Sequence, residues 1–310
     1  MQNQSVAAVM PQRKLSKKTK EALVAYSFIA PNFIGFTIFT LVPLISAFVL
    51  AFLKWDGANP IEFAGFDNFI RLTRDTSFHR AFINTIVYTI GVVPITLAAA
   101  LALAILLNQK IKARNFFRTV AFFPYIASLV AVSAVWNFLF SPTLGPINNF
   151  LNAVTGIPFE QLPRWIASKD WAMITVIMFT VWKNMGYYMI IYLAGLQGIN
   201  AELYEAADLD GANTRQKFLN ITIPQLAPTT FFVTMILIIN SFKVYDIFIT
   251  LLAGGDNQLV DHSRVLVYQI YNTAFRSLEY GYASAMSIVL FVLVLGITLV
   301  QFYSEKKFGA

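Results

Sequence analysis

The stretch Tyr204-Glu205-Ala206-Ala207-Asp208-Leu209-Asp210-Gly211-Ala212 is a polar island in a chain that is otherwise mostly apolar. It continues through Asn213 to Ile221-Thr222-Ile223-Pro224. We expect the rest of the chain to be organised around this island.

The island predicts two short helices with a bend between them. Asn200 can cap the first helix, since its side-chain oxygen can accept an unpaired backbone N–H. Gly211 can end it, because glycine adopts the left-handed conformation without steric cost. Asn213 with Gln216 has the spacing of a capping box that opens the second helix. Pro224, which lacks an N–H, is expected to mark its end.

The first of these helices is suited to docking rather than to catalysis. Ala206 and Ala207 are small where a surface helix usually carries larger side chains, so another protein's backbone can approach closely. Glu205 and Asp208 flank this small face and can contact cations. We interpret residues 200–225 as a docking loop.

The spacing from Glu205-Ala206-Ala207 through Gly211 to Ile221-Thr222-Ile223-Pro224 resembles the EAA motif of type I binding-protein-dependent ABC importers, which lies in a cytoplasmic loop of their membrane subunits. Ile223 is a conservative departure, since leucine commonly precedes the proline. From about Phe63 onward the chain resembles the sugar-permease branch, which includes the maltose and glycerol-phosphate importers. The flanking residues that carry this likeness are Trp182, Gly186, Leu196-Gln197, Leu203-Tyr204 and Gly254-Gly255, with Asp256 where proline is frequent.

The resemblance implies a permease subunit that moves a sugar or small oligosaccharide across the cytoplasmic membrane of a prokaryote by alternating access. Its implied partners are a second homologous permease subunit, two ATP-binding cassette subunits and an extracytoplasmic substrate-binding protein. The first helix of the docking loop would be the coupling helix. The residues implied to couple transport to ATP hydrolysis are Glu205, Ala206, Ala207, Asp208, Gly211 and Pro224.

Composition independently predicts a polytopic, all-α membrane protein. The chain has 310 residues, of which 57% are hydrophobic and only 13% charged, and its mean hydropathy is +0.61. It is too apolar for an ordinary soluble domain and too long for a single membrane anchor. The absence of cysteine excludes disulfides, thiolate nucleophiles and cysteine-based metal sites.

Apolar runs predict six spanning helices, each long enough to cross the hydrocarbon core. They cover residues 22–54 and then about Phe82 to Leu107, Val120 to Phe140, Trp171 to Leu196, Leu226 to Leu252 and Tyr282 to Phe302. The first is preceded by a tail at residues 1–21. An outer connection at residues 55–81, with a short aromatic helix near residues 63–69, leads to a five-helix core at residues 82–303 and a tail at residues 304–310.

The distribution of Lys and Arg predicts the orientation. Thirteen of the 23 lie on the side of the N-terminus, eight lie on the opposite side, and Lys183 and Lys243 lie inside spans. Positive residues are retained in the cytoplasm, so both termini and the docking loop are expected there. Because the basic residues sit at the ends of apolar runs, we expect contact with membrane lipid and none with nucleic acid.

No catalytic or metal site is predicted in this chain. It has no Gly-x-x-x-x-Gly-Lys-Ser/Thr phosphate loop, so ATP and Mg²⁺ are expected on separate ATPase subunits. The two histidines, His79 and His262, fall in predicted outer connections and support neither a metal pair nor a catalytic triad.

Polar residues within the fourth and fifth spans form the candidate substrate pathway. One reading is a structural ion pair, in which Asp246 contacts Lys243 on the same helical face or Lys183 across the interface. The other is a pathway in which rings stack on sugar faces while amides and hydroxyls bond to sugar hydroxyls. The candidates are Trp182, Lys183, Asn184, Tyr187, Tyr188, Asn240, Ser241, Lys243 and Asp246.

Three alternatives remain open on the sequence alone. A glycerol-phosphate importer would use the positive charges of Lys183 and Lys243. An ion-coupled secondary transporter would use Asp246 as its coupling carboxylate, although the docking motif argues against this class. A membrane scaffold without transport would show no substrate-stimulated ATPase activity in its assembly.

Overall fold

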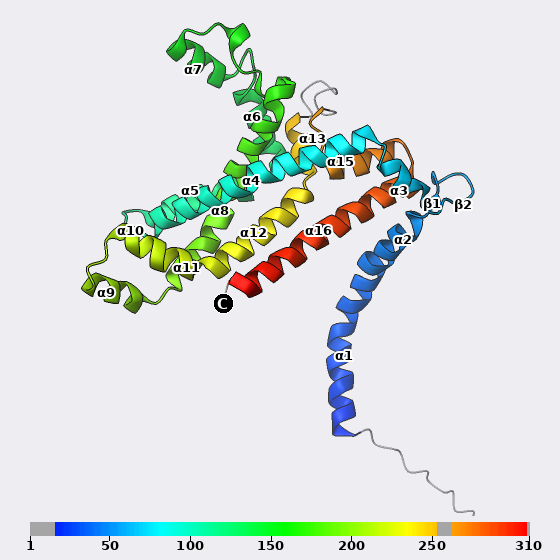
Figure 1. The fold of residues 1–310 in the computed structure, drawn as a ribbon, viewed down its shortest axis with the longest axis horizontal. Coiled ribbons are helices and arrows are strands. Elements are labelled where there is room, and N and C mark those ends of the chain that lie inside the picture. The colour runs from blue at the N-terminus through cyan, green and yellow to red at the C-terminus, as the bar shows by residue number, and fades with distance from the viewer. Residues whose placement is uncertain (1–15, 253–261, 309–310) are drawn as a thin grey trace, which may run out of the picture.

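The computed structural model describes residues 16–252 and 262–308, which form a helical structure with one small β-hairpin (Figure 1). Most of the N-terminal tail, the Gly254-Gly255 pair with Asp256, and residues 309–310 lie outside the described residues. The predictions made for those positions are therefore not addressed by the structure.

The first helical segment consists of α1 (Lys17–Phe36), the π-helical turn η1 (Thr37–Leu41) and α2 (Val42–Leu50). It begins ahead of residue 22 because the Ser16 hydroxyl accepts the Thr19 N–H at 3.2 Å. It ends at Leu50, and the chain then enters a hairpin that the sequence did not predict. In this hairpin β1 (Leu53–Lys54) pairs antiparallel with β2 (Glu62–Phe63).

A short helix, α3 (Asp67–Leu72), follows the hairpin and overlaps the end of the helix that was expected near residues 63–69. It begins later than expected because Glu62 and Phe63 pair with β1. Its buried Asn68 side chain donates to the carbonyls of Ala51 at 2.9 Å and Leu53 at 3.0 Å. These bonds satisfy carbonyls at the end of the first helical segment and hold α3 against it.

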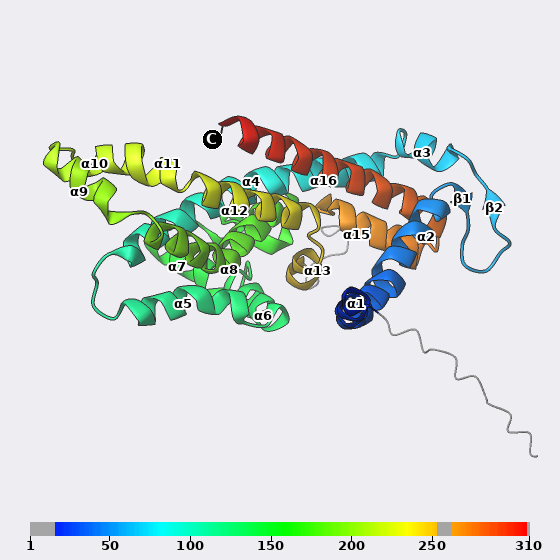
Figure 2. The same ribbon diagram turned by 90° about the horizontal axis from the view of Figure 1, so that it is seen from below.

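Four long helices carry the rest of the body: α4 (Thr76–Asn108), α8 (Lys169–Gln197), α12 (Ala227–Phe242) and α16 (Tyr280–Phe308). Helix α4 packs along both α8 and α12 (Figures 1 and 2). The shorter elements are α5 (Arg114–Ile126), α6 (Leu129–Leu139), α7 (Pro146–Thr155), η2 (Phe159–Gln161), η3 (Trp165–Ala167), α9 (Ala201–Leu209), α10 (Thr214–Lys217), η4 (Phe218–Thr222), α11 (Ile223–Gln225), α13 (Asp246–Leu252), α15 (Leu266–Tyr271) and η5 (Asn272–Arg276).

Two of the predicted spans are broken into separate helices. Pro124 inside the first run predicts a kink there, whereas the break in the second run was not predicted. The run from Val120 to Phe140 divides into α5 and α6, which meet at 97°. Pro124 lies in the last turn of α5, where its missing N–H weakens the helical ladder. The run from Leu226 to Leu252 divides at Lys243, and the chain resumes as α13 at Asp246.

Within residues 16–252 and 262–308, four helices are long and apolar enough to cross a membrane by themselves. The number reaches the predicted six when each bent pair counts as one span. One pair is α5 with α6, and the other joins residues 214–225 to α12 through a 61° bend.

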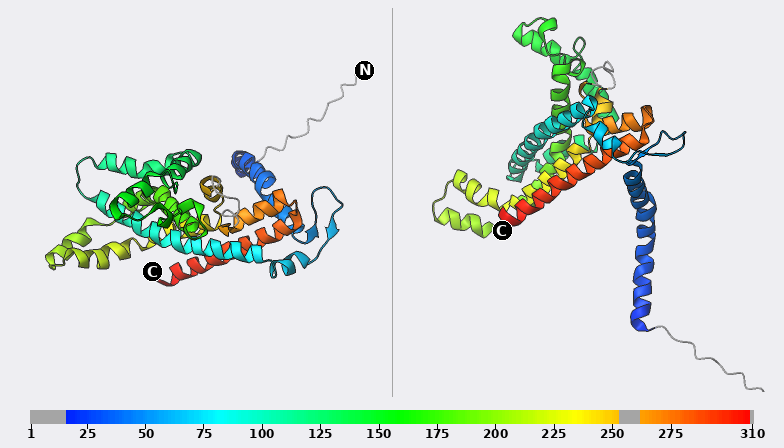
Figure 3. Two further views of the ribbon diagram at one scale, coloured as in Figure 1. Left: turned by 90° about the horizontal axis from the view of Figure 1, so that it is seen from above. Right: turned by 45° about the vertical axis from the view of Figure 1, so that its right-hand side comes forward.

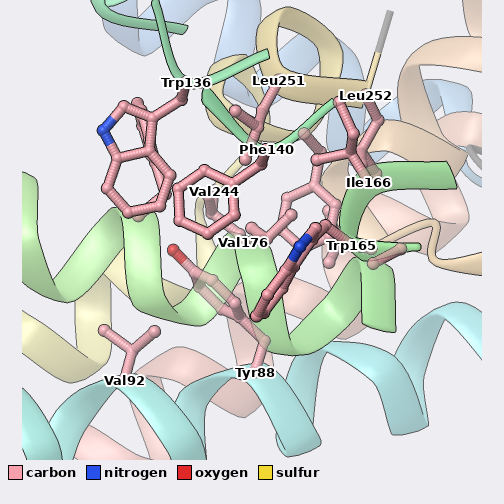
Figure 4. Packing of buried hydrophobic residues seen from close by; sticks show 14 of the residues in the cluster. Tyr88, Val92, Trp136, Phe140, Trp165, Ile166, Val176, Val244, Leu251 and Leu252 are labelled. Carbon is pink, nitrogen blue, oxygen red and sulfur yellow. The ribbon is translucent and has the colours of Figure 1, made fainter. Parts of the chain in front are cut away.

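An aromatic cluster holds α4, α6, α8 and α13 together (Figure 4). The Trp136 ring stacks on Phe140 with centroids 4.6 Å apart and meets Phe179 edge-on at 5.1 Å. Phe140 in turn meets Trp165 at 5.1 Å. These edge-on and stacked pairs fix the position of α6 against α8.

Asp75 connects the start of α4 to the start of the last helix, α16. Its Oδ1 accepts the N–H groups of Ser77 at 2.8 Å and Phe78 at 3.2 Å, and Oδ2 accepts the Tyr282 hydroxyl at 2.7 Å. Partial burial raises the pKa of Asp75, but these hydrogen bonds and the Arg71 charge outweigh it and hold the pKa below the ordinary value.

We expect Asp75→Asn to destabilise the protein at neutral pH by on the order of 1 kcal/mol. A carboxyl with a lowered folded-state pKa stabilises the fold above its unfolded-state pKa, and this contribution is lost as the pH falls through the folded-state pKa. The difference in melting temperature between wild type and variant should therefore shrink from pH 7 towards about pH 3. Asp67→Asn, at an exposed position, is the control; an equal, pH-independent difference for Asp75→Asn would contradict the prediction.

Candidate functional site

The first helix of the docking loop is capped at both ends as the sequence predicted. The Asn200 side-chain oxygen accepts the Glu202 N–H at 3.1 Å. Gly211 takes a φ of +74°, and its N–H donates to the Asp208 carbonyl at 3.1 Å while the Ala212 N–H donates to Ala207 at 2.8 Å. This pair of bonds is a Schellman motif, which satisfies the last carbonyls of α9.

The second half of the docking loop opens with the predicted capping box. The Asn213 side chain accepts the Gln216 N–H at 2.9 Å, and the Gln216 side chain accepts the Asn213 N–H at 2.8 Å. The helix ends at Gln225, one residue after Pro224, so the predicted end is confirmed to within one residue. The π-helical turn η4, which ends at Thr222, leads into this last turn, where Pro224 has no N–H to donate.

Two side-chain contacts tie the halves of the docking loop together. Lys217 Nζ lies 2.6 Å from Asp208 Oδ1, and the hydroxyls of Tyr204 and Thr222 lie 2.9 Å apart. Asp208 therefore meets a cation within its own loop.

The outward face of α9 is left uncovered in the part of the chain that the structure describes. Glu205 and Ala206 are exposed on it, and Ala207 is half-buried beside them. Leu209 is 90% exposed, which is unusual for a leucine on a well-capped helix. Together, Glu205, Ala206 and Leu209 lie at the i, i+1 and i+4 positions of one stripe.

A cavity of about 360 Å³ lies among α4, α8, α12 and the break between α5 and α6, and we call it the central cavity. Eight of the nine predicted pathway residues line it: Lys183, Asn184, Tyr187, Tyr188, Asn240, Ser241, Lys243 and Asp246. Trp182 is the exception. Its ring packs against Trp136 at 5.4 Å in the aromatic cluster, because it faces α6 from the other side of α8.

Four further polar residues that line the central cavity were missed by the sequence analysis: Tyr88, Tyr125, Thr180 and Tyr245. Tyr88 donates to Thr180 at 3.1 Å, and Tyr125 stacks on Tyr187 with ring centroids 4.5 Å apart and planes 16° apart. A tyrosine inside a predicted span, such as Tyr88, is the signal that could have found them. The cavity thus combines stacked rings with amides and hydroxyls.

The ion pair of the first reading does not form among the residues that the structure describes. Among residues 16–252 and 262–308, Lys183, Lys243 and Asp246 take part in no ion pair within 4.0 Å. Lys243 and Asp246 do not share a helical face, because α12 ends at Phe242 and α13 begins only at Asp246. Lys183 instead donates to the carbonyls of Pro124 at 2.9 Å and Ala127 at 3.0 Å.

Residues 93–309 match the family described as the binding-protein-dependent transport system inner membrane component. The chain belongs to this family. The match includes the whole docking loop and every residue that lines the central cavity except Tyr88 and Val92.

Relatives extend the likeness over nearly the full length. The chain is 31% identical to the probable starch degradation products transport system permease protein AmyD of Thermoanaerobacterium thermosulfurigenes, over 95% of this chain and 98% of that one. It is 34% identical to the lactose transport system permease protein LacF of Rhizobium radiobacter, over 90% and 93%. A crystal structure of a bacterial ABC transporter that imports the acidic polysaccharide alginate contains a chain that matches with a TM-score of 0.83, at 26% identity and covering 94% of this chain and 98% of that one.

Proposed function

We propose that this family member is the permease subunit of an ATP-driven importer for a sugar or small oligosaccharide. The observation that carries the proposal is the uncovered face of α9, with Leu209 90% exposed on a helix capped at both ends. A rigid helix with an exposed leucine and small neighbours is suited to insertion into a partner protein. The partner would be an ATPase subunit, since the sequence has no phosphate-binding loop.

The central cavity supports a carbohydrate as the solute. The Tyr125 and Tyr187 rings offer flat apolar faces, while Asn184, Asn240 and Ser241 offer hydrogen bonds to hydroxyls. The two relatives act on starch degradation products and lactose by name, and the solved transporter on alginate. Lys243 and Asp246 contribute charges of opposite sign, and the charge of Lys183 is compensated by the carbonyls of Pro124 and Ala127. This arrangement favours a solute without net charge.

A second permease subunit is the partner that we propose for α1. None of the residues of α1 is buried, and the helix projects away from the bundle (Figures 1 and 3). Lipid alone could cover this apolar helix, but a homologous subunit would also complete the wall of the transport pathway.

The extracytoplasmic binding protein would dock at the opposite end of the bundle from α9. There, an open hollow of about 760 Å³ is lined by charges of both signs, including Arg71, Arg74, Asp75 and Glu279. Arg71 and Glu279 form an ion pair at 2.7 Å. Mixed charges of this kind can steer and orient a protein partner.

In the proposed mechanism, ATP binding on the partner subunits draws their two copies together and moves the docking loop with them. The contacts of Asp208 with Lys217 and of Tyr204 with Thr222 make the two halves of the loop move as one body. The loop continues directly into α12, which lines the central cavity. Closure at the loop would thereby switch the cavity between inward-facing and outward-facing states.

We place the chain in the cytoplasmic membrane of a prokaryote with the docking loop inside. The C-terminal end of α16 points towards the same end of the bundle as α9 to α11 (Figures 1 and 2). The excess of Lys and Arg at that end supports this orientation.

The proposal predicts that the purified assembly, in lipid with its binding protein, hydrolyses ATP faster when its solute is present. The measurement is ATPase activity across a panel of neutral sugars, oligosaccharides and glycerol phosphate. Stimulation by a neutral sugar would support the proposal in full. Stimulation by glycerol phosphate alone would show an importer whose solute is glycerol phosphate and not a sugar. Uptake that persists without an ATPase subunit would favour ion-coupled transport through Asp246 and overturn the proposal.

A further inference from the structure

Lys183 is the buried cation of α8, with 9% of its surface exposed. A lysine inside a membrane span is costly unless its charge is compensated. In the described part of the chain, the compensation comes from backbone carbonyls: those of Pro124 at 2.9 Å, Ala127 at 3.0 Å and Tyr125 at 3.5 Å. No carboxylate among these residues lies within ion-pair distance of it.

The three carbonyls belong to the C-terminal end of α5. A helix end leaves its last carbonyls without intrahelical partners, and the helix dipole makes that end negative. Here the chain also turns through 97° into α6 directly after Ala127. Lys183 therefore supplies both the missing hydrogen bonds and the opposite charge at a break that the bilayer would otherwise penalise.

Two neighbours of Lys183 on α8 show how closely α5 packs against α8. Gly186, three residues on, faces the backbone of Ala121 and Phe122 in α5. Tyr187, four residues on, stacks on Tyr125, whose carbonyl contacts Lys183. The ammonium, the close backbone approach and the ring stack thus lie on one face of α8, against one segment of α5.

We propose that Lys183 is a positioning residue that holds the break between α5 and α6 and thereby keeps Tyr125 stacked on Tyr187 in the wall of the central cavity. Its charge is satisfied by α5 and does not serve to bind an anionic solute. The part of this inference that concerns transport rests on the proposed function; the part that concerns the break does not.

The test uses the full chain, whose lack of cysteine allows spin labels at chosen sites. Labels at Thr119→Cys on α5 and Ala134→Cys on α6, both exposed positions, report the distance across the break. Lys183→Met keeps the length of the side chain and removes its donors. We expect the width of the distance distribution to rise about twofold, because the end of α5 loses its hydrogen bonds.

Lys183→Arg should restore a distribution like that of the wild type, since guanidinium can also donate to several carbonyls. Lys243→Met is the matched control. Lys243 lines the same cavity and is exposed, and its side chain makes no hydrogen bond or ion pair to the described residues. The distance distribution of Lys243→Met should equal that of the wild type.

In the assembled complex, Lys183→Met should lower the solute imported per ATP hydrolysed by about tenfold, the equivalent of one charge-assisted hydrogen bond. Lys183→Arg should recover most of this loss. An unchanged distance distribution in Lys183→Met would overturn the positioning role, and so would a variant that only changes the preference between neutral and anionic solutes. If the wild-type complex shows no solute-stimulated ATPase activity, the proposed function fails while the distance measurement still decides the role of Lys183.

Discussion

Gly186→Ala should abolish the normal packing of α5 against α8, although it adds a single methyl group. A Cβ at this position would lie 2.6 Å from the carbonyl carbon of Ala121 and 2.9 Å from the Cα of Phe122, and would overlap the Ala121 carbonyl oxygen. All three are backbone atoms, so no side chain can rotate away. Overpacking of this kind costs about 1–3 kcal/mol, or more where backbone must move.

The measurement is the amount of monodisperse protein recovered in mild detergent, together with its melting temperature. Gly296→Ala on α16 is the matched control, because a Cβ there would have no neighbour within 4 Å. Since alanine favours helix over glycine by about 1 kcal/mol, the control should be neutral or slightly stabilised. Equal recovery of the two variants would show that α5 and α8 are not held as closely as the structure indicates.

Leu209→Glu should leave the isolated chain folded but prevent it from retaining ATPase subunits. The side chain is 90% exposed, so the substitution removes almost no internal packing and the melting temperature should be unchanged. If Leu209 fills a pocket in the partner, burial of a carboxylate there should weaken binding by about 2 kcal/mol or more, roughly thirtyfold. Co-purification of the ATPase subunits with the tagged permease measures this loss.

Leu144→Glu is the control for a charge placed on an exposed leucine. Leu144 is 74% exposed in the connection between α6 and α7, away from the docking loop. It should retain the ATPase subunits at the wild-type level. If Leu209→Glu also retains the ATPase subunits at the wild-type level, the exposed face of α9 is not the docking surface. The proposed coupling would then lose its main support.

The docking loop shows which features could be predicted from sequence. Asn200, Gly211 and the Asn213–Gln216 capping box were each assigned correctly, because every bond that they make closes within a few residues. The end of the second helix was also predicted to within one residue, since Pro224 lacks an N–H and the helix ends at Gln225. The π-helical turn at residues 218–222 was not predicted.

In the membrane-embedded part, too, some features could be predicted from the sequence and others could not. Hydropathy alone located six apolar runs and the polar residues within two of them, because the bilayer demands long apolar segments and tolerates few charges. The structure decided that α5 and α6 meet at 97°, that Lys183 bonds to carbonyls 56 to 59 residues away and that Trp182 faces the aromatic cluster. These outcomes depend on which helices pack against each other. The hydrophobic pattern of a single helix does not show which other helix it will contact.

The sequence by itself therefore determined the class of protein, its apolar runs and the docking motif, since all three follow from composition and short-range spacing. Only the tertiary structure decided which polar side chains share the central cavity and which are occupied elsewhere. The physical reason is that a buried polar group bonds to the partner that packing brings to it. For Lys183 that partner was the end of a broken helix, and the apolar run from Val120 to Phe140 contains no sign of the break beyond Pro124.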